Sequence, residues 1–428
     1  MLNIYNSADA LLEKLKNRMD NKFDEALRTA REIIADVKAD GDAAVKRYTS
    51  KFDGVETDNF FMSDDEINKI FARCDKELVK IMEKAARNIE EYHRTQAQNS
   101  SIVTRDGVIL GQRILPLDSA ALYVPGGTAS YPSTVIMNAI PAKIAGVREL
   151  IILTPPKKSE QYGIRPEIIA AAKICGIDKI FRAGGAQAVA AAAYGTESLG
   201  RVDKIVGPGN IYVAAAKKLV YGDVDIDSIA GPSEILIIAD KNANPKYIAA
   251  DLMSQAEHDV LASSVLLTDS RELAGQVDAE LRAQVKNLSR SDIIKQSLAD
   301  YGGCVLCGSI AQAIELSNKI APEHLELLVA NPFELLDAVK NAGSVFLGEY
   351  SPEPLGDYFA GTNHILPTNG TARFASPLGV YSFTKKSSFI YYSREKLREV
   401  SGDIIKFAES EQLTAHANSI KIRENREN

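Results

Sequence analysis

The sequence lacks the features that mark membrane, secreted and nucleic-acid-binding proteins. No stretch of its 428 residues approaches the roughly 18 consecutive apolar residues of a membrane span. Residues 1–20 contain neither the apolar core nor the small-residue cleavage site of a signal peptide. No block rich in lysine and arginine is present, and the formal net charge is -7. We therefore expect a cytoplasmic protein that binds neither membranes nor nucleic acid.

Cysteine is scarce and scattered. The four residues Cys74, Cys175, Cys304 and Cys307 do not form a disulfide framework. Cys304 and Cys307 make one CxxC pair, but a zinc site of this kind needs a second pair. The pair stands in the apolar, strand-like run GGCVLCG. We interpret both as buried thiols in preference to a redox or metal site.

The remaining composition is that of an ordinary globular protein, with 45% apolar and 25% charged residues. Its length predicts two or three domains. Residues 1–100 have helical periodicity, clearest at 75–96, and residues 101–120 resemble short strands with turns. From residue 121 onward, strands alternate with helices of roughly ten residues, which predicts an α/β fold with a parallel sheet. Glycine-rich turns follow several strands, where such sheets bind ligands.

Two later segments have a different composition. Residues 351–380 are rich in Gly, Pro, Ser and Thr, which predicts a long irregular loop of the kind that is often functional. Residues 393–428 are polar and helical, and they are a weak candidate for an independent core. We expect this tail to dock on another part of the assembly, such as a second subunit.

The five histidines are candidate functional residues. His93 lies on the charged helix 75–96, and we predict that it is a solvated surface residue. Gln255 and His258 are three apart in DLMSQAEHD, so on a helix they would share a face and could bind one metal ion. The alternative is that His258 is only a hydrogen-bonded histidine near a helix end.

Glu323 and His324 in APEHLELL would suit general acid–base chemistry, because each can be tuned towards neutral pH. The alternative is the first turn of a helix, where Pro322 and Glu323 are favourable.

The glycine-rich loop PLGDYFAGTNHILPT holds three more candidates, Asp357, Asn363 and His364. They could bind a metal or serve turn formation. In EQLTAHAN, Glu411 and His416 stand five apart in a predicted terminal helix, for which a plain surface helix is the alternative.

Two glycine-rich turns could face a nucleotide, but each is a weak signal. GPGNIYV lacks the dinucleotide fingerprint, because Pro208 has no N–H and Tyr212 stands where Gly or Ala should be. GGAQAVAA places Gln187 at a helix start, which favours a phosphate. Most such glycines only close tight turns.

Taken together, these motifs are more specific than any one of them. The order LYVPGG, GGAQA, VDKIVGPGN, AGPSE, DLMSQAEHD, PEHLE, GSVFLGEYSPEPLGDYFAGTNHILPT and LTAHAN resembles that of the histidinol dehydrogenases, over about residues 20–420. The resemblance implies a zinc-dependent, NAD-linked oxidation of L-histidinol through L-histidinaldehyde to L-histidine, the last two steps of histidine biosynthesis. It implies one Zn²⁺ per active site and two NAD⁺ per histidinol.

The resemblance also implies roles for residues at matching positions. Glu323 and His324 would be the catalytic acid–base pair. The zinc ligands would be Gln255, His258, Asp357 and His416. These four ligands and His324 would also contact substrate, together with Ser233, His364 and Glu411. The NAD⁺ contacts would be Tyr123, Gln187 and Asn210. Asp259 stands where the family often has Gly, and the sequence alone does not explain it.

The implied fold is α/β, with two incomplete Rossmann-like domains, one inserted in the other. The expected parts are an N-terminal helical segment (1–20), a first domain (21–122 plus 233–378), an inserted second domain (123–232) and a C-terminal helical tail (379–428). The tail would intertwine two subunits of a homodimer whose active sites are shared.

Two rival functions remain at this stage. One is an NAD-linked dehydrogenase of another zinc-chelating amino alcohol or aldehyde; an aldehyde dehydrogenase of the thiohemiacetal type is disfavoured because no cysteine sits in a catalytic-loop context. The other is a non-catalytic metal-binding protein, against which the intact Glu323–His324 pair speaks.

Overall fold

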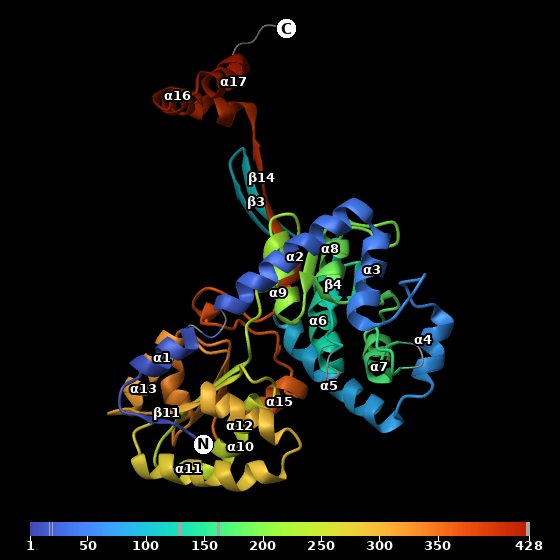
Figure 1. Ribbon diagram of the computed structural model, residues 1–428. Coiled ribbons are helices and arrows are strands. Elements are labelled where there is room, and N and C mark those ends of the chain that lie inside the picture. Colours follow the sequence, from blue (N-terminus) through green and yellow to red (C-terminus); the bar gives the residue numbers. More distant parts are fainter. Residues whose placement is uncertain (17, 19, 127–130, 161–162, 425–428) are drawn as a thin grey trace. The chain divides into compact units, whose positions relative to one another are not determined.

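A computed structural model describes residues 1–16, 18, 20–126, 131–160 and 163–424 (Figure 1). The chain divides into two compact units, Met1–Gln96 with Leu117–Phe383, and Ala97–Pro116 with Thr384–Asn428. The first unit is built on two parallel sheets and the second on an antiparallel sheet. Among the described helices, none combines the length and the apolar character that crossing a membrane would require.

A six-stranded parallel sheet organises one half of the first unit. Its order is β1 (Ile4–Tyr5), β11 (Gly303–Leu306), β10 (Ser263–Thr268), β9 (Glu234–Ala239), β12 (His324–Leu328) and β13 (Ser344–Leu347). Strand β9 is buried throughout, as expected for a parallel strand covered on both faces. Its Ile235 and Ile237 pack on α10 (Pro245–Ala256), α11 (Arg271–Gln284) and α12 (Ser291–Asp300). Leu236 and Ile238 face α1 (Asp9–Lys16) and α13 (Ile310–Ile320).

A five-stranded parallel sheet organises the other half. Its order is β6 (Ile180–Phe181), β5 (Glu149–Leu153), β4 (Ser119–Tyr123), β7 (Lys204–Val206) and β8 (Asp225–Ile226). Side chains of β4 alternate between two cores. Leu122 packs with α4 (Asp64–Phe71), α5 (Lys76–Arg94), α6 (Pro132–Ala145) and α7 (Pro166–Ile174). Tyr123 packs with α2 (Asp20–Asp40), α3 (Asp42–Asp53), α8 (Gly185–Tyr194) and α9 (Ile211–Val220).

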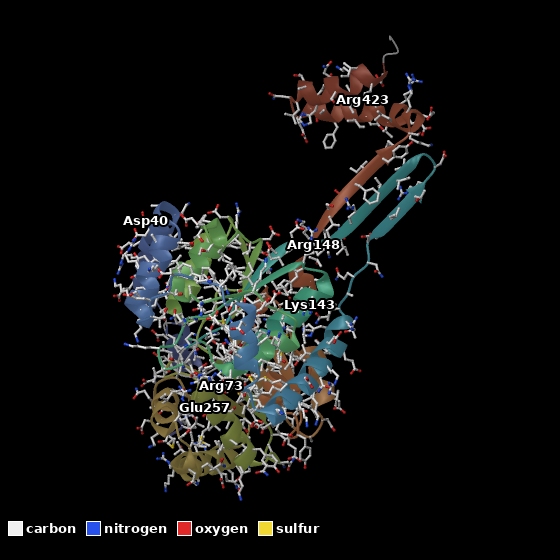
Figure 2. All side chains as sticks on the ribbon, turned by 90° about the vertical axis from the view of Figure 1, so that its right-hand side faces the viewer. Asp40, Arg73, Lys143, Arg148, Glu257 and Arg423 are labelled. Carbon is white, nitrogen blue, oxygen red and sulfur yellow. The ribbon has the colours of Figure 1, made fainter. Side chains whose placement is uncertain are left out.

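Most charged side chains of this unit are exposed or partly exposed, and only a few are buried. Asp40, Lys143 and Arg148, which are labelled in Figure 2, are examples of its exposed charged residues. The strands between the helix layers carry mostly apolar, buried side chains instead. The two short elements α14 (Pro332–Leu335) and α15 (Glu353–Tyr358) complete the unit, and α15 carries candidate site residues.

The second unit is small and partly apolar on its surface. An antiparallel sheet of β14 (Thr384–Tyr392), β3 (Val108–Pro116) and β2 (Ser101–Arg105) precedes the helices α16 (Arg394–Ser410) and α17 (Thr414–Glu424). Val103, Ile390 and Phe407 are exposed within the single chain. Such exposed apolar side chains favour burial by a partner.

The predicted α/β class with parallel sheets is confirmed, and Cys304 and Cys307 are buried free thiols as expected. Two local predictions are wrong. The segment at Glu323 and His324 does not begin a helix, because His324–Leu328 pairs with β9 and β13 as strand β12. The loop predicted at 351–380 is not wholly irregular, since it contains α15 and a short 3-10 turn at Thr371–Arg373.

His93 is also not the surface residue that its charged helix suggested. Its side chain is fully buried, and its Nδ1 lies 2.8 Å from the carbonyl oxygen of Ile89. The helix α5 turns Met82, Ala85, Ile89 and His93 to the core at helical spacing. Burial lowers the pKa of His93, so it serves the core as a neutral ring.

Candidate active site

The proposed acid–base pair lies at the amino end of strand β12. Glu323 precedes the strand and His324 begins it, directly beside the start of β9. Both side chains are buried. The Nδ1 of His324 lies 2.9 Å from the carbonyl oxygen of Glu234, which suits an Nδ1–H donor. That bond leaves Nε2 as the available ring nitrogen, and Nε2 is buried without a hydrogen-bond partner among the described residues.

Burial sets the direction of the pKa shift of Glu323, whereas neighbouring carboxylates reverse the effect of burial on the pKa of His324. Burial, opposed by the charge of His324, raises the pKa of Glu323 to about 7. Burial alone would lower the pKa of His324, but the carboxylates of Glu323 and Asp357 raise it to about 10 in the metal-free protein. A carboxyl group that titrates near neutrality suits general acid–base chemistry.

Asp357 faces His324 from helix α15. Its Oδ1 lies 3.6 Å from the Nε2 of His324. Burial would raise the pKa of Asp357, but the facing His324 and the charge of the nearby His364 hold it well below its ordinary value. One turn earlier on α15, Glu353 accepts a hydrogen bond from the hydroxyl of Ser254 at 3.0 Å. Within the described chain, ligand atoms of His324, Glu353 and Asp357 lie within 4.8 Å of one another and could hold a metal ion.

Gln255 lies in the last turn of α10, and His258 follows the end of that helix. The helix ends at Ala256, so the prediction that both residues lie on one helical face is wrong. His258 follows in a turn, and its backbone N–H donates to the carbonyl oxygen of Gln255 at 3.2 Å. Burial lowers the pKa of His258 while the charge of Asp357 opposes it, which places the two side chains in one electrostatic environment.

The side-chain oxygen of Gln255 is the clearest sign that a cation would suit this place. This Oε1 is buried and has no hydrogen-bond partner in the described part of the chain. A buried acceptor left unpaired costs about 1–3 kcal/mol. A cation held with Asp357 and His258 would satisfy it, and nitrogen and oxygen donors of this kind suit zinc. The residues present therefore fit a metal ion.

Asp259, beside this site, has a structural explanation. Its Oδ1 accepts the backbone N–H of Leu261 at 2.8 Å, and its carbonyl oxygen accepts that of Ala262. Its side chain is exposed. The residue thus stabilises the turn that leads from α10 into β10.

Two further predicted substrate contacts lie in the same unit. Ser233 immediately precedes Glu234 and β9, and its carbonyl oxygen accepts the N–H of Ser263 at 3.0 Å. His364 is fixed at both ring nitrogens: Nδ1 lies 3.0 Å from the carbonyl oxygen of Asp357, and Nε2 lies 3.4 Å from the hydroxyl of Thr134 on α6. The structure therefore brings His364 to Asp357.

Glu411 and His416 belong to the second unit, whereas the other candidates lie in the first. Both are exposed within the single chain. They do not share one terminal helix as predicted, because Glu411 is the C-cap that follows α16 and His416 lies on α17. Their part in the site stays a prediction.

A separate cavity of about 790 Å³ opens at the carboxyl ends of the five-stranded sheet. Tyr123, Gln187 and Asn210, the three predicted NAD⁺ contacts, all line it. Strand order reverses here between β4, which lies next to β5, and β7, and such switch points are where open α/β sheets bind ligands. Its volume lies in the range of small-molecule and cofactor sites.

The geometry of the cavity wall depends on one glycine. Gly185 has φ +62°, and a Cβ there would lie 2.6 Å from the Oε1 of Gln187. Its N–H donates to the hydroxyl of Tyr123 at 3.0 Å. Asn210 caps α9 by accepting the N–H groups of Tyr212 and Val213. In the motif GGAQA, the backbone at Gly185 therefore lies so close to neighbouring side chains that only Gly fits there.

Sequence comparison identifies the family of this chain. The family profile described as histidinol dehydrogenase matches residues 16–424. The chain belongs to the histidinol dehydrogenase family. It is 55% identical to the histidinol dehydrogenase of Clostridium acetobutylicum over 412 residues, which cover 96% of this chain and 95% of the relative. For the Bacillus subtilis enzyme, identity is 52% over 413 residues, covering 96% of both chains.

A solved structure supports the same assignment. The crystal structure of histidinol dehydrogenase from Elizabethkingia anophelis superposes with a TM-score of 0.92 and 39% identity, covering 99% of this chain and 98% of that one. The chain is accordingly an enzyme of the histidinol dehydrogenase family, with a group of side chains able to hold a metal.

The sequence analysis did not identify three residues that lie near the site, namely Glu353, Glu234 and Arg18. Glu353 stands four residues before Asp357, a spacing that places both on one face of α15. That spacing was a usable signal. Glu234 was visible only as the last residue of AGPSE, and nothing in the sequence connected Arg18 to it.

Proposed function

We propose that this enzyme oxidises L-histidinol through L-histidinaldehyde to L-histidine in a zinc-dependent, NAD⁺-linked, four-electron reaction, the last two steps of histidine biosynthesis. The observation that carries the proposal is the buried Glu323–His324 pair beside Asp357, in a chain that shares about half its residues with histidinol dehydrogenases along its whole length. Cytoplasmic location and a homodimer with shared active sites are parts of the same proposal.

Gln255, His258, Asp357 and His416 are the proposed zinc ligands. The unpartnered Oε1 of Gln255 and the ionised carboxylate of Asp357 support this set, and the resemblance contributes His416 from the second unit. A bound zinc ion would supply a template that orients the imidazole and amine of the substrate. His324 and Glu353 remain outside the set, because His324 is assigned to proton transfer and Glu353 is engaged by Ser254.

His324 is the proposed acceptor of the alcohol proton. Its bond to the carbonyl oxygen of Glu234 holds the ring and leaves Nε2 free. The carboxylates of Glu323 and Asp357 raise the pKa of this ring, and a cation bound to Asp357 would weaken the contribution of that carboxylate. Bound NAD⁺ would supply the hydride acceptor.

Glu323 is the proposed base of the second oxidation. Its carboxyl group lies next to His324, with its Oε2 3.7 Å from the ring Nδ1. A pKa of about 7 allows it to accept a proton from water near neutral pH. Burial of the pair limits solvent access, which helps retain the reactive aldehyde between the two steps.

The cavity at the five-stranded sheet is the proposed NAD⁺ site, with contacts from Tyr123, Gln187 and Asn210. Its place at the strand-order reversal and its volume support a cofactor. The lysines Lys157 and Lys158 also line it and could face phosphate groups.

The test is a count of NADH formed per L-histidinol, followed by absorbance with and without a chelator. Two NADH per histidinol, abolished by chelation and restored by zinc, is the expected result. One NADH per histidinol would instead indicate an alcohol dehydrogenase that releases the aldehyde, and none would favour a non-catalytic metal-binding protein. In the same assay, Glu323→Gln should still form aldehyde from histidinol but oxidise added histidinaldehyde poorly; equal loss of both steps would contradict this division of roles.

A further inference from the structure

Glu234 contacts both members of the proposed acid–base pair. Its backbone N–H donates to the Oε2 of Glu323 at 2.9 Å, and its carboxylate Oε2 accepts the N–H of Glu323 at 3.3 Å. Its carbonyl oxygen lies 2.9 Å from the Nδ1 of His324. Glu323 is thus held through both its side chain and its backbone by a single residue, which is itself buried.

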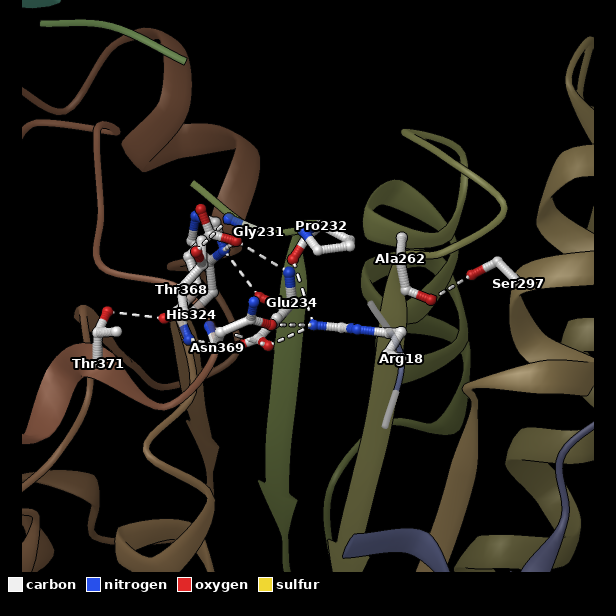
Figure 3. Close-up of polar contacts among 11 residues, drawn as sticks. Arg18, Gly231, Pro232, Glu234, Ala262, Ser297, His324, Thr368, Asn369 and Thr371 are labelled. Carbon is white, nitrogen blue, oxygen red and sulfur yellow. Dashed lines mark hydrogen bonds and ion pairs between the residues drawn. The ribbon is translucent and has the colours of Figure 1, made fainter. Parts of the chain in front are cut away.

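Arg18 holds Glu234 from the other side. Its Nη2 donates to the Oε1 of Glu234 at 2.6 Å, to the Oδ1 of Asn369 at 3.0 Å and to the carbonyl oxygen of Pro232 at 3.4 Å (Figure 3). The backbone N–H of Asn369 also donates to Oε1 of Glu234. The side chains of Arg18 and Glu234 are only 1% and 11% exposed.

This arrangement solves an electrostatic difficulty. Glu234 and Glu323 are both buried, and each carboxyl group accepts the backbone N–H of the other residue, so two uncompensated negative charges there would repel. The guanidinium of Arg18 compensates Glu234 alone, since no contact joins Arg18 to Glu323 in the described structure. The carboxylate of Glu234 thus bonds the guanidinium of Arg18 through one oxygen and the N–H of Glu323 through the other, and hydrogen bonds to charged groups are the stronger ones.

We propose that Glu234, fixed by Arg18, is a positioning residue for Glu323 and serves the aldehyde-oxidising step. The inference rests on the proposed function, which gives Glu323 that step. Catalytic groups misplaced by small distances lose large rate factors. Loss of the Arg18–Glu234 ion pair should therefore slow the second oxidation far more than the first, in which His324 is held by a backbone carbonyl that no side-chain replacement removes.

The main variant is Arg18→Met, with Arg18→Lys as the conservative rescue and Glu234→Gln as a second variant that keeps the side-chain volume. Lys204→Met is the matched control, because it also removes a buried cation from an ion pair, with Asp225 at 2.7 Å, at the start of β7 in the other sheet. For each protein, kcat and KM are measured separately with histidinol and with histidinaldehyde, and NADH per histidinol is counted.

Arg18→Met and Glu234→Gln should lower kcat for histidinaldehyde about 10- to 100-fold, with its KM and the histidinol-to-aldehyde rate nearly unchanged. NADH per histidinol should fall from two towards one as aldehyde escapes, and Arg18→Lys should restore most of the loss. Lys204→Met should lower thermal stability without moving this ratio.

If Arg18→Met slows both oxidations equally, the positioning role is overturned and the ion pair only stabilises the fold. The same conclusion follows if Arg18→Met and Lys204→Met show the same ratio of the second oxidation rate to the first. If Arg18→Met fails to fold, Glu234→Gln decides by the same ratio. A wild-type protein that forms two NADH per histidinol while the variants lose both steps equally overturns this inference alone. A wild-type protein that forms none overturns the proposed function and this inference with it.

Discussion

His324 and Asp357 face each other across 3.6 Å, with the Nε2 of the ring directed at the Oδ1 of the carboxylate. This contact joins the proposed acid–base pair to the proposed metal ligands. In the proposed site, Asp357 would therefore have two competing partners, the ring of His324 and the metal ion. Substitutions on either side of the contact separate metal binding from proton transfer.

His258→Asn should lose bound zinc and nearly all activity, because it removes one of four proposed ligands while Gln255 and Asp357 remain. Metal content by atomic spectroscopy measures the first effect directly. His364→Asn is the matched control: this histidine lies against Asp357 and Thr134 but is not a proposed ligand, so its variant should keep the metal and raise the KM for histidinol. Full zinc content in His258→Asn would remove His258 from the ligand set.

Tyr123→Phe should weaken NAD⁺ binding about 3- to 10-fold, because it removes the hydroxyl that accepts the N–H of Gly185, a bond worth about 0.5–1.5 kcal/mol. Calorimetric titration with NAD⁺ measures the effect without turnover. Tyr48→Phe is the control. It also loses a hydrogen bond from a tyrosine hydroxyl, but that bond joins Tyr48 on α3 to Asp36 on α2. Unchanged affinity in Tyr123→Phe would argue that this hydroxyl does not shape the cofactor site.

Inactive His416→Asn and inactive His258→Asn proteins, when mixed, should regain part of the wild-type activity if active sites are shared between subunits. A mixed dimer would then contain one site with both native histidines. Differently tagged chains allow the mixed dimers to be isolated before assay. Isolated mixed dimers without activity would mean that each site is built from one chain.

Asp53 should make stability depend on pH. Burial raises its pKa from 3.8 to about 6. Between these values the folded protein holds a proton that the unfolded chain releases, so stability falls as pH rises through this window and levels off above pH 6. After allowance for solvent screening the effect is on the order of 1 kcal/mol.

Asp53→Asn removes this dependence, so its unfolding temperature relative to wild type should rise between about pH 4 and pH 6 and then stay constant. Asp58→Asn is the control, because that exposed carboxylate pairs with Lys46 and should give no such gain. Parallel curves for wild type and Asp53→Asn would mean that Asp53 stays accessible to solvent.

Much of the architecture was predictable because it is encoded locally. Runs such as EILIIA are too apolar for a half-exposed strand, and alternation with helices then requires parallel sheets. The site was harder to predict. LELL after Pro322 and Glu323 fits a helix or a buried strand equally well, and only its position between β9 and β13 decides for the strand.

Other errors came from signals that were present but outweighed. His93 follows Ile89 by four residues on the buried stripe of α5, so its spacing indicated burial although its neighbours are charged. Arg18 and Glu234 lie 216 residues apart, and no local pattern could have joined them. Contacts of that kind depend on the completed sheet.

The separation of Arg18 from Glu234 also bears on how the chain is made. Ribosomes add roughly 5–20 residues per second, so Arg18 emerges some 10–40 s before its carboxylate partner. Strand β1 must wait still longer, because it pairs with β11 at Cys304. During that interval the N-terminal segment has neither its ion pair nor its neighbouring strand. The first residues to be synthesised are thus among the last to reach their native contacts.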